Sequence, residues 1–93
     1  MKVFATAQSP TAVSVTWRYD LGDEIPQVSV TILEFGPDGK QVASQPNLPV
    51  QGGLALFQGL TPDTNYMYQW CRVFSSVAGD LTSCADPSTN AHV

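Results

Sequence analysis

The chain has 93 residues and a formal net charge of −4, with four Lys and Arg against eight Asp and Glu. This length accommodates one compact domain and excludes a two-domain enzyme. The negative balance provides no basic surface for nucleic acid, and 43% hydrophobic with 13% charged residues excludes a disordered chain or a coiled coil. Residues 1–6 lack the long apolar run of a signal peptide or membrane helix, so no membrane insertion is expected.

The first predicted elements are strands, because no window sustains the apolar spacing of a helix. Residues 3–7 are expected to form an edge strand. Residues 12–19 alternate cleanly, with Val13, Val15 and Trp17 on the inward face. A half-buried strand is therefore predicted there.

A hairpin is predicted next. Residues 27–35 alternate with Val28, Val30 and Ile32 facing inward. The Gly-Pro-Asp-Gly sequence at residues 36–39 is typical of a turn, and it leads into a short strand at about residues 40–44.

The last three predicted strands lie in the second half of the chain. Residues 54–57 are expected to form a strand that faces the core through Leu54 and Leu56. An aromatic-rich strand follows at residues 66–74, and a tight turn connects it to a last strand near residues 81–85.

Seven short strands separated by turns predict an all-β fold, a seven-stranded immunoglobulin-like β-sandwich. Residues 1–87 are expected to form the domain. Residues 88–93 are expected to be a C-terminal tail, frayed or the start of a linker.

Three segments carry a resemblance to a known family. Residues 9–17 end in a Trp, residues 59–66 read Gly-Leu-Thr-Pro-Asp-Thr-Asn-Tyr, and residues 66–70 read Tyr-Met-Tyr-Gln-Trp. Together they resemble the fibronectin type III domain across essentially the whole chain. The resemblance implies a core Trp and a tyrosine corner, in which a Tyr hydroxyl bonds back to nearby backbone. The residues given these structural roles are Trp17, Leu60, Pro62 and Tyr66.

One residue departs from the family pattern. Arg72 falls on the inward set, where the family usually has a small apolar residue. Either the strand bulges at Arg72 or the guanidinium reaches out past the rim of the sandwich.

The two cysteines are expected to form a disulfide. Cys71 and Cys84 lie symmetrically about Val77 and Ala78, the centre of the proposed turn, so they should face each other on the outer side of the sheet. The alternative is a pair of reduced thiols in a cytosolic domain. A zinc site is disfavoured, because His92 in the tail does not complete a ligand set with metal-site spacing.

No catalytic constellation is visible, and neither enzymatic activity nor a cofactor is expected. The one histidine lies next to the C-terminal residue. Asp20, Asp23 and Glu24 cluster in a loop, but without the spacing of a known calcium site they are interpreted as a solvated acidic turn.

Two surfaces are candidate binding sites. Loops at residues 20–26, 47–52 and 75–81 are expected to converge at one pole and to present apolar side chains, namely Ile25, Leu48, Val50 and Val77. Alternatively, each of these side chains caps the core. The second candidate is an outward stripe, in which Leu33 and Phe35 lie near Met67 and Gln69; the alternative is that long neighbouring side chains cover it.

The predicted function is that of a non-catalytic spacer or binding module in an extracellular or cell-surface protein. The resemblance implies a setting such as an adhesion protein, a receptor or a secreted carbohydrate-active enzyme. Expected partners are neighbouring domains and a protein or carbohydrate ligand, with the chain itself monomeric. The alternatives are a virion or phage-tail structural domain and an engineered binding scaffold, because a fold by itself does not determine function.

Overall fold

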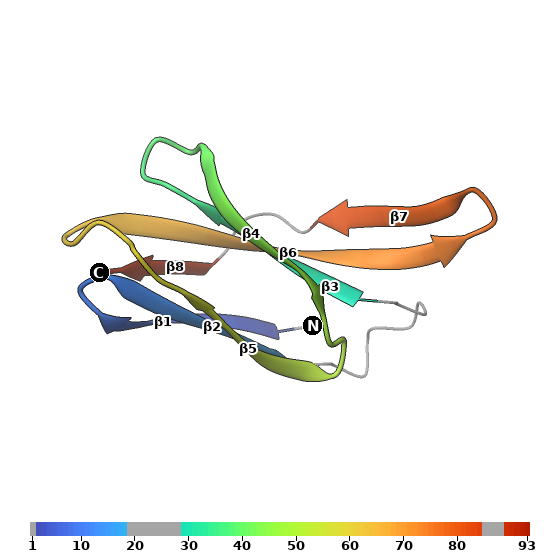
Figure 1. Ribbon diagram of the computed structural model, residues 1–93, viewed down its shortest axis with the longest axis horizontal. Coiled ribbons are helices and arrows are strands. Elements are labelled where there is room, and N and C mark those ends of the chain that lie inside the picture. The colour runs from blue at the N-terminus through green and yellow to red at the C-terminus, as the bar shows by residue number, and fades with distance from the viewer. Residues whose placement is uncertain (1, 19–28, 85–88) are drawn as a thin grey trace.

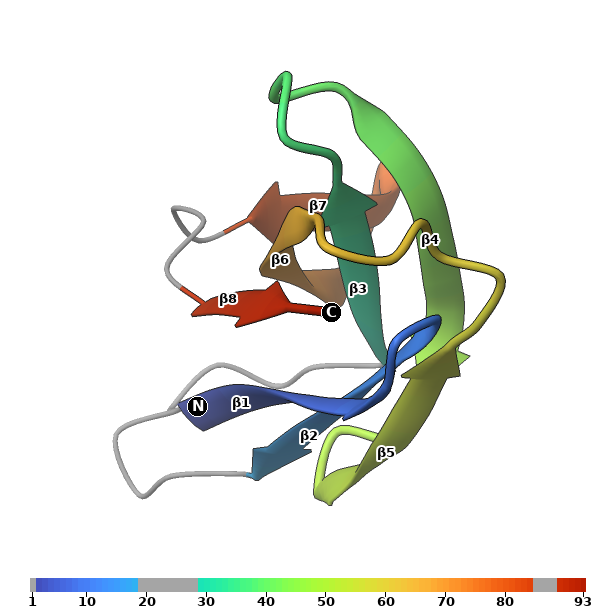
Figure 2. The same ribbon diagram turned by 90° about the vertical axis from the view of Figure 1, so that its left-hand side faces the viewer.

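The computed structural model describes residues 2–18, 29–84 and 89–93, and these residues form eight strands in two antiparallel sheets. One sheet has the order β1-β2-β5, and the other has the order β4-β3-β6-β7 with β8 also paired to β6. The two sheets form the layers of an open sandwich (Figure 1, Figure 2). The strands are β1 (Lys2–Ser9), β2 (Ala12–Arg18), β3 (Ser29–Phe35), β4 (Gln41–Leu48), β5 (Gly52–Phe57), β6 (Asn65–Ser76), β7 (Gly79–Cys84) and β8 (Thr89–His92).

The core lies between the sheets and is built by alternate residues of the central strands. Each fully buried aliphatic or aromatic side chain contributes about 1.5–3 kcal/mol through the hydrophobic effect. The inward faces predicted for residues 12–19 and 27–35 are confirmed for the described part of each strand, whereas Val28 lies outside the described residues. The buried residues of β2, β3 and β6 include Val13, Val15, Trp17, Val30, Ile32, Tyr66 and Tyr68.

The prediction for β5 was wrong in its choice of face. Leu54 and Leu56 are exposed, and Ala55 and Phe57 are buried instead. The register explains this, because Phe57 lies directly opposite Val13, and directly opposed residues share one face of a sheet. Burying Phe57 also removes more apolar surface from water than burying a Leu would.

Trp17 is fixed by the turn that precedes β5. Its indole N–H donates a hydrogen bond to the carbonyl oxygen of Pro49, with 2.6 Å between the two heavy atoms. Gly52 has a φ of +137°, and a Cβ there would lie 2.8 Å from the Trp17 carbonyl oxygen. A Cβ on Gly53 would lie 3.1 Å from the indole ring. The paired glycines therefore allow the backbone to approach this Trp closely.

The edge strand β4 is longer than the short strand predicted at residues 40–44. It continues to Leu48, through Pro46. The register between β3 and β4 shifts between the pairs Ile32–Gln45 and Val30–Leu48. An irregular edge of this kind tolerates a proline, which cannot donate to the ladder.

The C-terminal residues form a strand, so the prediction of a frayed tail at residues 88–93 was wrong for its described part. β8 pairs with the start of β6, and Ala91 is buried. The backbones of Thr64 and Val93 exchange two hydrogen bonds, of 3.2 and 3.1 Å. The pairing stabilises a segment whose own four residues show little apolar alternation.

Arg72 stacks on a neighbour without distorting the strand. The pairing between β3 and β6 runs without a register shift through Arg72, so there is no bulge there. The guanidinium carbon lies 4.7 Å from the centre of the Trp70 ring. This cation–π contact accommodates the charge on the inward set at the rim of the sandwich.

Tyr66 forms the contact that a tyrosine corner requires. Its side chain is buried, and its hydroxyl accepts a hydrogen bond of 3.0 Å from the backbone N–H of Thr61. The bond fixes the connection between β5 and β6 against the start of β6.

Replacing Tyr66 by Phe should lower the free energy of unfolding by about 1 kcal/mol, or more if the Thr61 N–H stays shielded from water. Urea denaturation of the wild type and the variant measures the difference. An unchanged midpoint would show that the hydroxyl contributes nothing to the stability of the corner.

Candidate functional site

Cys71 and Cys84 are joined by a disulfide, as the sequence predicted. They are direct cross-strand partners on β6 and β7. The turn between the two strands is centred on Val77 and Ala78, also as predicted. Cys71 is buried, whereas Cys84 is exposed. The disulfide therefore braces the hairpin formed by β6 and β7.

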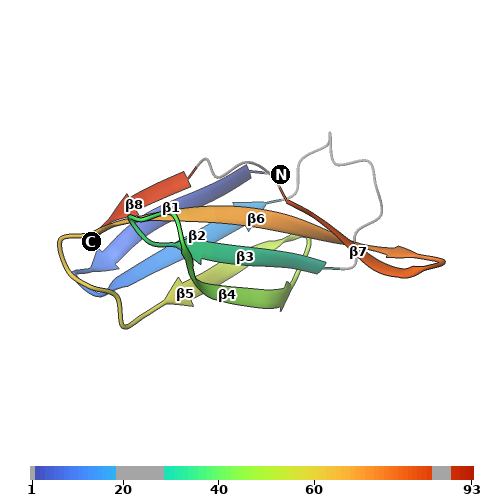
Figure 3. The ribbon, with the colours of Figure 1, turned by 90° about the horizontal axis from the view of Figure 1, so that it is seen from above.

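This hairpin projects beyond the rest of the sandwich (Figure 1, Figure 3). The described part of β3 pairs with β6 only as far as Val73. Among the residues that the structure describes, the remainder of β6 pairs only with β7. Every residue of β7 is exposed. Leu81, which lies opposite Phe74, is 57% exposed, and Val77 at the turn is fully exposed. The end of the hairpin therefore presents apolar side chains to solvent.

The apolar residues predicted at one loop pole differ in their exposure to solvent. Leu48 and Val50 are partly buried and pack against the core, which is the capping role that the sequence left open. Val77 lies at the tip of the projecting hairpin instead. Ile25 and the acidic residues Asp20, Asp23 and Glu24 lie outside the described residues.

The outward stripe has the predicted register. Leu33 is paired with Gln69, and Phe35 is paired with Met67. The three apolar members, Leu33, Phe35 and Met67, are all half-buried. The outer face of the larger sheet is therefore partly apolar along β3 and β6.

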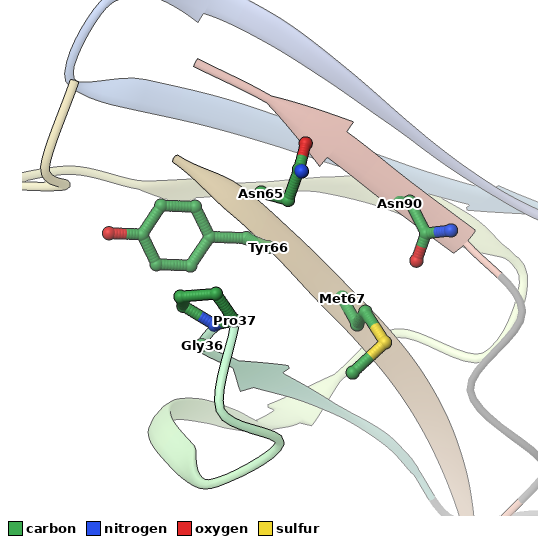
Figure 4. Close-up of a pocket in the computed structure, with 6 residues that line it drawn as sticks. All are labelled: Gly36, Pro37, Asn65, Tyr66, Met67 and Asn90. Carbon is green, nitrogen blue, oxygen red and sulfur yellow. The ribbon is translucent and has the colours of Figure 1, made fainter. Parts of the chain in front are cut away.

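A shallow pocket of about 380 Å³ lies at one end of this stripe (Figure 4). Its lining combines a thioether, a proline ring and two side-chain amides. The one ionisable group in the lining is a tyrosine whose hydroxyl already accepts the hydrogen bond from Thr61. The chemistry of the pocket is therefore neutral, with hydrogen-bonding groups beside apolar surface. The lining residues are Gly36, Pro37, Asn65, Tyr66, Met67 and Asn90.

His92 belongs to a small polar cluster beside the pocket. Its Nδ1 lies 2.6 Å from Oδ1 of Asn65, and its Nε2 lies 3.0 Å from Oδ1 of Asp63. The side chains of His92 and Asp63 are 55% and 94% exposed, so the ion pair contributes little to stability. The contacts attach β8 to the start of β6.

A buried acid, Glu34, was not predicted from the sequence. Glu34 is 1% exposed, and the hydroxyl of Tyr68, its cross-strand partner on β6, donates a hydrogen bond to its carboxyl group. The alternation of Val30 and Ile32 was the signal that could have found it, since it places Glu34 on the same inward face.

Burial controls the ionisation of this pair. Burial raises the pKa of Glu34 above its ordinary value, and the hydrogen bond from Tyr68 only partly opposes this shift. The pKa of Tyr68 is raised by burial and by the hydrogen bond and negative charge of Glu34. Folding therefore shifts the ionisation of both groups toward the uncharged form, relative to the same groups in water.

Comparison with known proteins identifies no family for this chain. No family model matches it, and no curated protein matches it. Within residues 2–18, 29–84 and 89–93, no group of three or more His, Cys, Asp and Glu side chains is placed to hold a metal ion. The described residues contain no helix long and apolar enough to cross a membrane.

Protein purified without reductant should gain the mass of two hydrogens when it is reduced, because one disulfide opens. Replacing Cys71 and Cys84 together by Ser should lower the free energy of unfolding by up to about 3 kcal/mol, and by less where the hairpin already restricts the unfolded chain. Intact mass spectrometry and urea denaturation measure the two effects. Two free thiols in protein made under oxidising conditions would contradict the bond.

Proposed function

We propose that this chain is a non-catalytic, extracellular spacer module of the fibronectin type III kind, which holds neighbouring domains of a longer protein apart. The observation that carries the proposal is the direction of the first and last strands. β1 and β8 lie next to each other and run the same way, so the chain enters the described fold at one end and leaves at the other.

Contacts at both ends of β1 support this direction. Near its start, the carbonyl oxygen of Val3 accepts a hydrogen bond of 3.2 Å from the Thr89 hydroxyl, at the start of β8. Beyond its far end, the carbonyl oxygen of Thr11 accepts a bond from the N–H of Leu60, in the connection that also binds Val93 through Thr64. The entry and exit are therefore separated by about the length of β1, roughly 25 Å at 3.3 Å per residue.

The strand order and two contacts of the core, those of Trp17 and Tyr66, support the choice of family. The first, second and fifth strands share one sheet, and the third, sixth and seventh share the other; β4 lies beside β3. Apart from the position of β4 and the additional strand β8, this division matches that of a constant-type immunoglobulin sandwich. Trp17 is buried in the core, and Tyr66 makes its corner with Thr61. These features are those that the family resemblance implies.

The disulfide supports the extracellular assignment. Disulfides form and persist mainly in oxidising compartments, where small domains use them to supplement a limited core. Cys71 and Cys84 brace a hairpin that the rest of the sandwich does not cover. A two-stranded hairpin of this kind is only marginally stable alone.

The spacer proposal predicts the geometry of a fusion protein that carries one folded test domain at each end. The denaturation midpoint of the chain should be the same in the fusion as in the chain alone. Small-angle scattering should show a single distance between the two test domains.

The matched control keeps the C-terminal test domain and moves the other into the exposed turn between Asp38 and Gly39. This turn lines the same pocket as Asn90 of β8, so the two test domains should lie closer together. Equal separations in both fusions, or a lower midpoint in the terminal fusion, would refute the spacer function.

A further inference from the structure

The carboxyl group of Glu34 lies between the sheets with a single hydrogen-bonding partner in the described part of the chain, the hydroxyl of Tyr68. The Tyr68 ring packs on Phe57 of the opposite sheet, with 5.2 Å between the ring centres. The acid is therefore placed where the two sheets meet. A charge at this position would be surrounded by aromatic and aliphatic side chains.

No cation in the described structure is placed to compensate that charge. β4 and β5 contain no charged residue, and β3 contains none besides Glu34. On β6 the ionisable neighbours are Tyr66 and Tyr68. Arg72 lies opposite Val30, four residues along β3 from Glu34, and stacks on Trp70.

The other charged side chains that the structure describes lie elsewhere on the fold. Arg18 lies at the end of β2 away from Phe57, which is opposite Val13. Lys40 is exposed in the hairpin turn, where Asp38 accepts a bond from its backbone N–H. His92 contacts Asp63 and Asn65. An ionised Glu34 therefore has the Tyr68 hydroxyl as its main stabilising contact.

We propose that Glu34 and Tyr68 form a pH-sensitive lock in the core, which keeps the two sheets packed while the carboxyl is neutral and weakens the fold when it ionises. This inference does not depend on the spacer function. It makes the contribution of this pair to stability greatest in acidic surroundings.

The sign of the effect follows from the raised pKa of Glu34 in the folded state. Below the ordinary pKa of a glutamate, about 4.3, both folded and unfolded chains carry the proton, and the lock contributes fully. As the pH rises, the unfolded chain releases its proton first, so unfolding becomes more favourable. The contribution is lost once the pH has passed the pKa of the folded state.

The test compares the wild type with Glu34→Gln, an uncharged group of nearly the same shape, by urea denaturation from pH 3 to pH 8. Asp80→Asn is the matched control, because it removes one carboxylate from the exposed strand β7. The ratio of the unfolding constants of wild type and Glu34→Gln should rise with pH, by up to about tenfold per pH unit within the sensitive range. The same ratio for Asp80→Asn should change much less.

A Glu34→Gln profile that differs from the wild type by a constant offset, or that loses stability relative to it as the pH rises, would overturn the proposal. Should Glu34→Gln fail to fold, the Glu34 carboxyl carbon can be titrated by NMR in the wild-type protein. A titration midpoint at or below that of an ordinary glutamate would overturn the proposal equally.

Tyr68→Phe separates the lock from simple loss of packing. The variant removes the hydrogen bond that favours the ionised carboxyl, so the sensitive range should extend to higher pH than in the wild type. A packing defect alone would lower stability by the same factor at every pH. If the stability of Tyr68→Phe differs from that of the wild type by the same factor at every pH, the proposed role of Tyr68 is contradicted.

Discussion

The antiparallel pairing of β3 with β6 is the interaction on which the rest of the structure depends. It fixes which side chains of each strand enter the core, because opposed residues share a face. The same register places Phe35 beside Met67 on the outer face and Glu34 beside Tyr68 on the inner face. The core, the outward stripe and the buried acid are therefore consequences of one alignment.

The length of β6 gives this strand two further partners besides β3. β8 pairs with its first residues and β7 with its last, so these two short strands lie in succession along one edge. The segment paired only with β7 forms the projecting hairpin, and the disulfide restricts its motion where it leaves the sandwich. This braced hairpin is consistent with the spacer role proposed above.

The hydroxyl groups of two tyrosines of β6, Tyr66 and Tyr68, have different kinds of hydrogen-bonding partner. The hydroxyl of Tyr66 accepts a hydrogen bond from the backbone N–H of Thr61, and this bond secures the corner. The hydroxyl of Tyr68 is bonded to a carboxyl group whose charge depends on pH. Both side chains are buried, so the partner makes the difference: Tyr66 is bonded to a backbone N–H, and Tyr68 is bonded to an ionisable carboxyl group.

The sequence by itself determined the all-β class, the inward faces of β2 and β3, the central turn of the hairpin and the cysteine pair, because alternation and turn residues are local signals. Tertiary structure alone decided the inward face of β5, since the choice between Leu56 and Phe57 depends on the register with Val13. It also decided that residues 89–92 form a strand, because backbone pairing with β6, and not their own composition, orders them. The buried state of Glu34 was decided in the same way, since only packing between the sheets establishes that an inward-facing acid is removed from water.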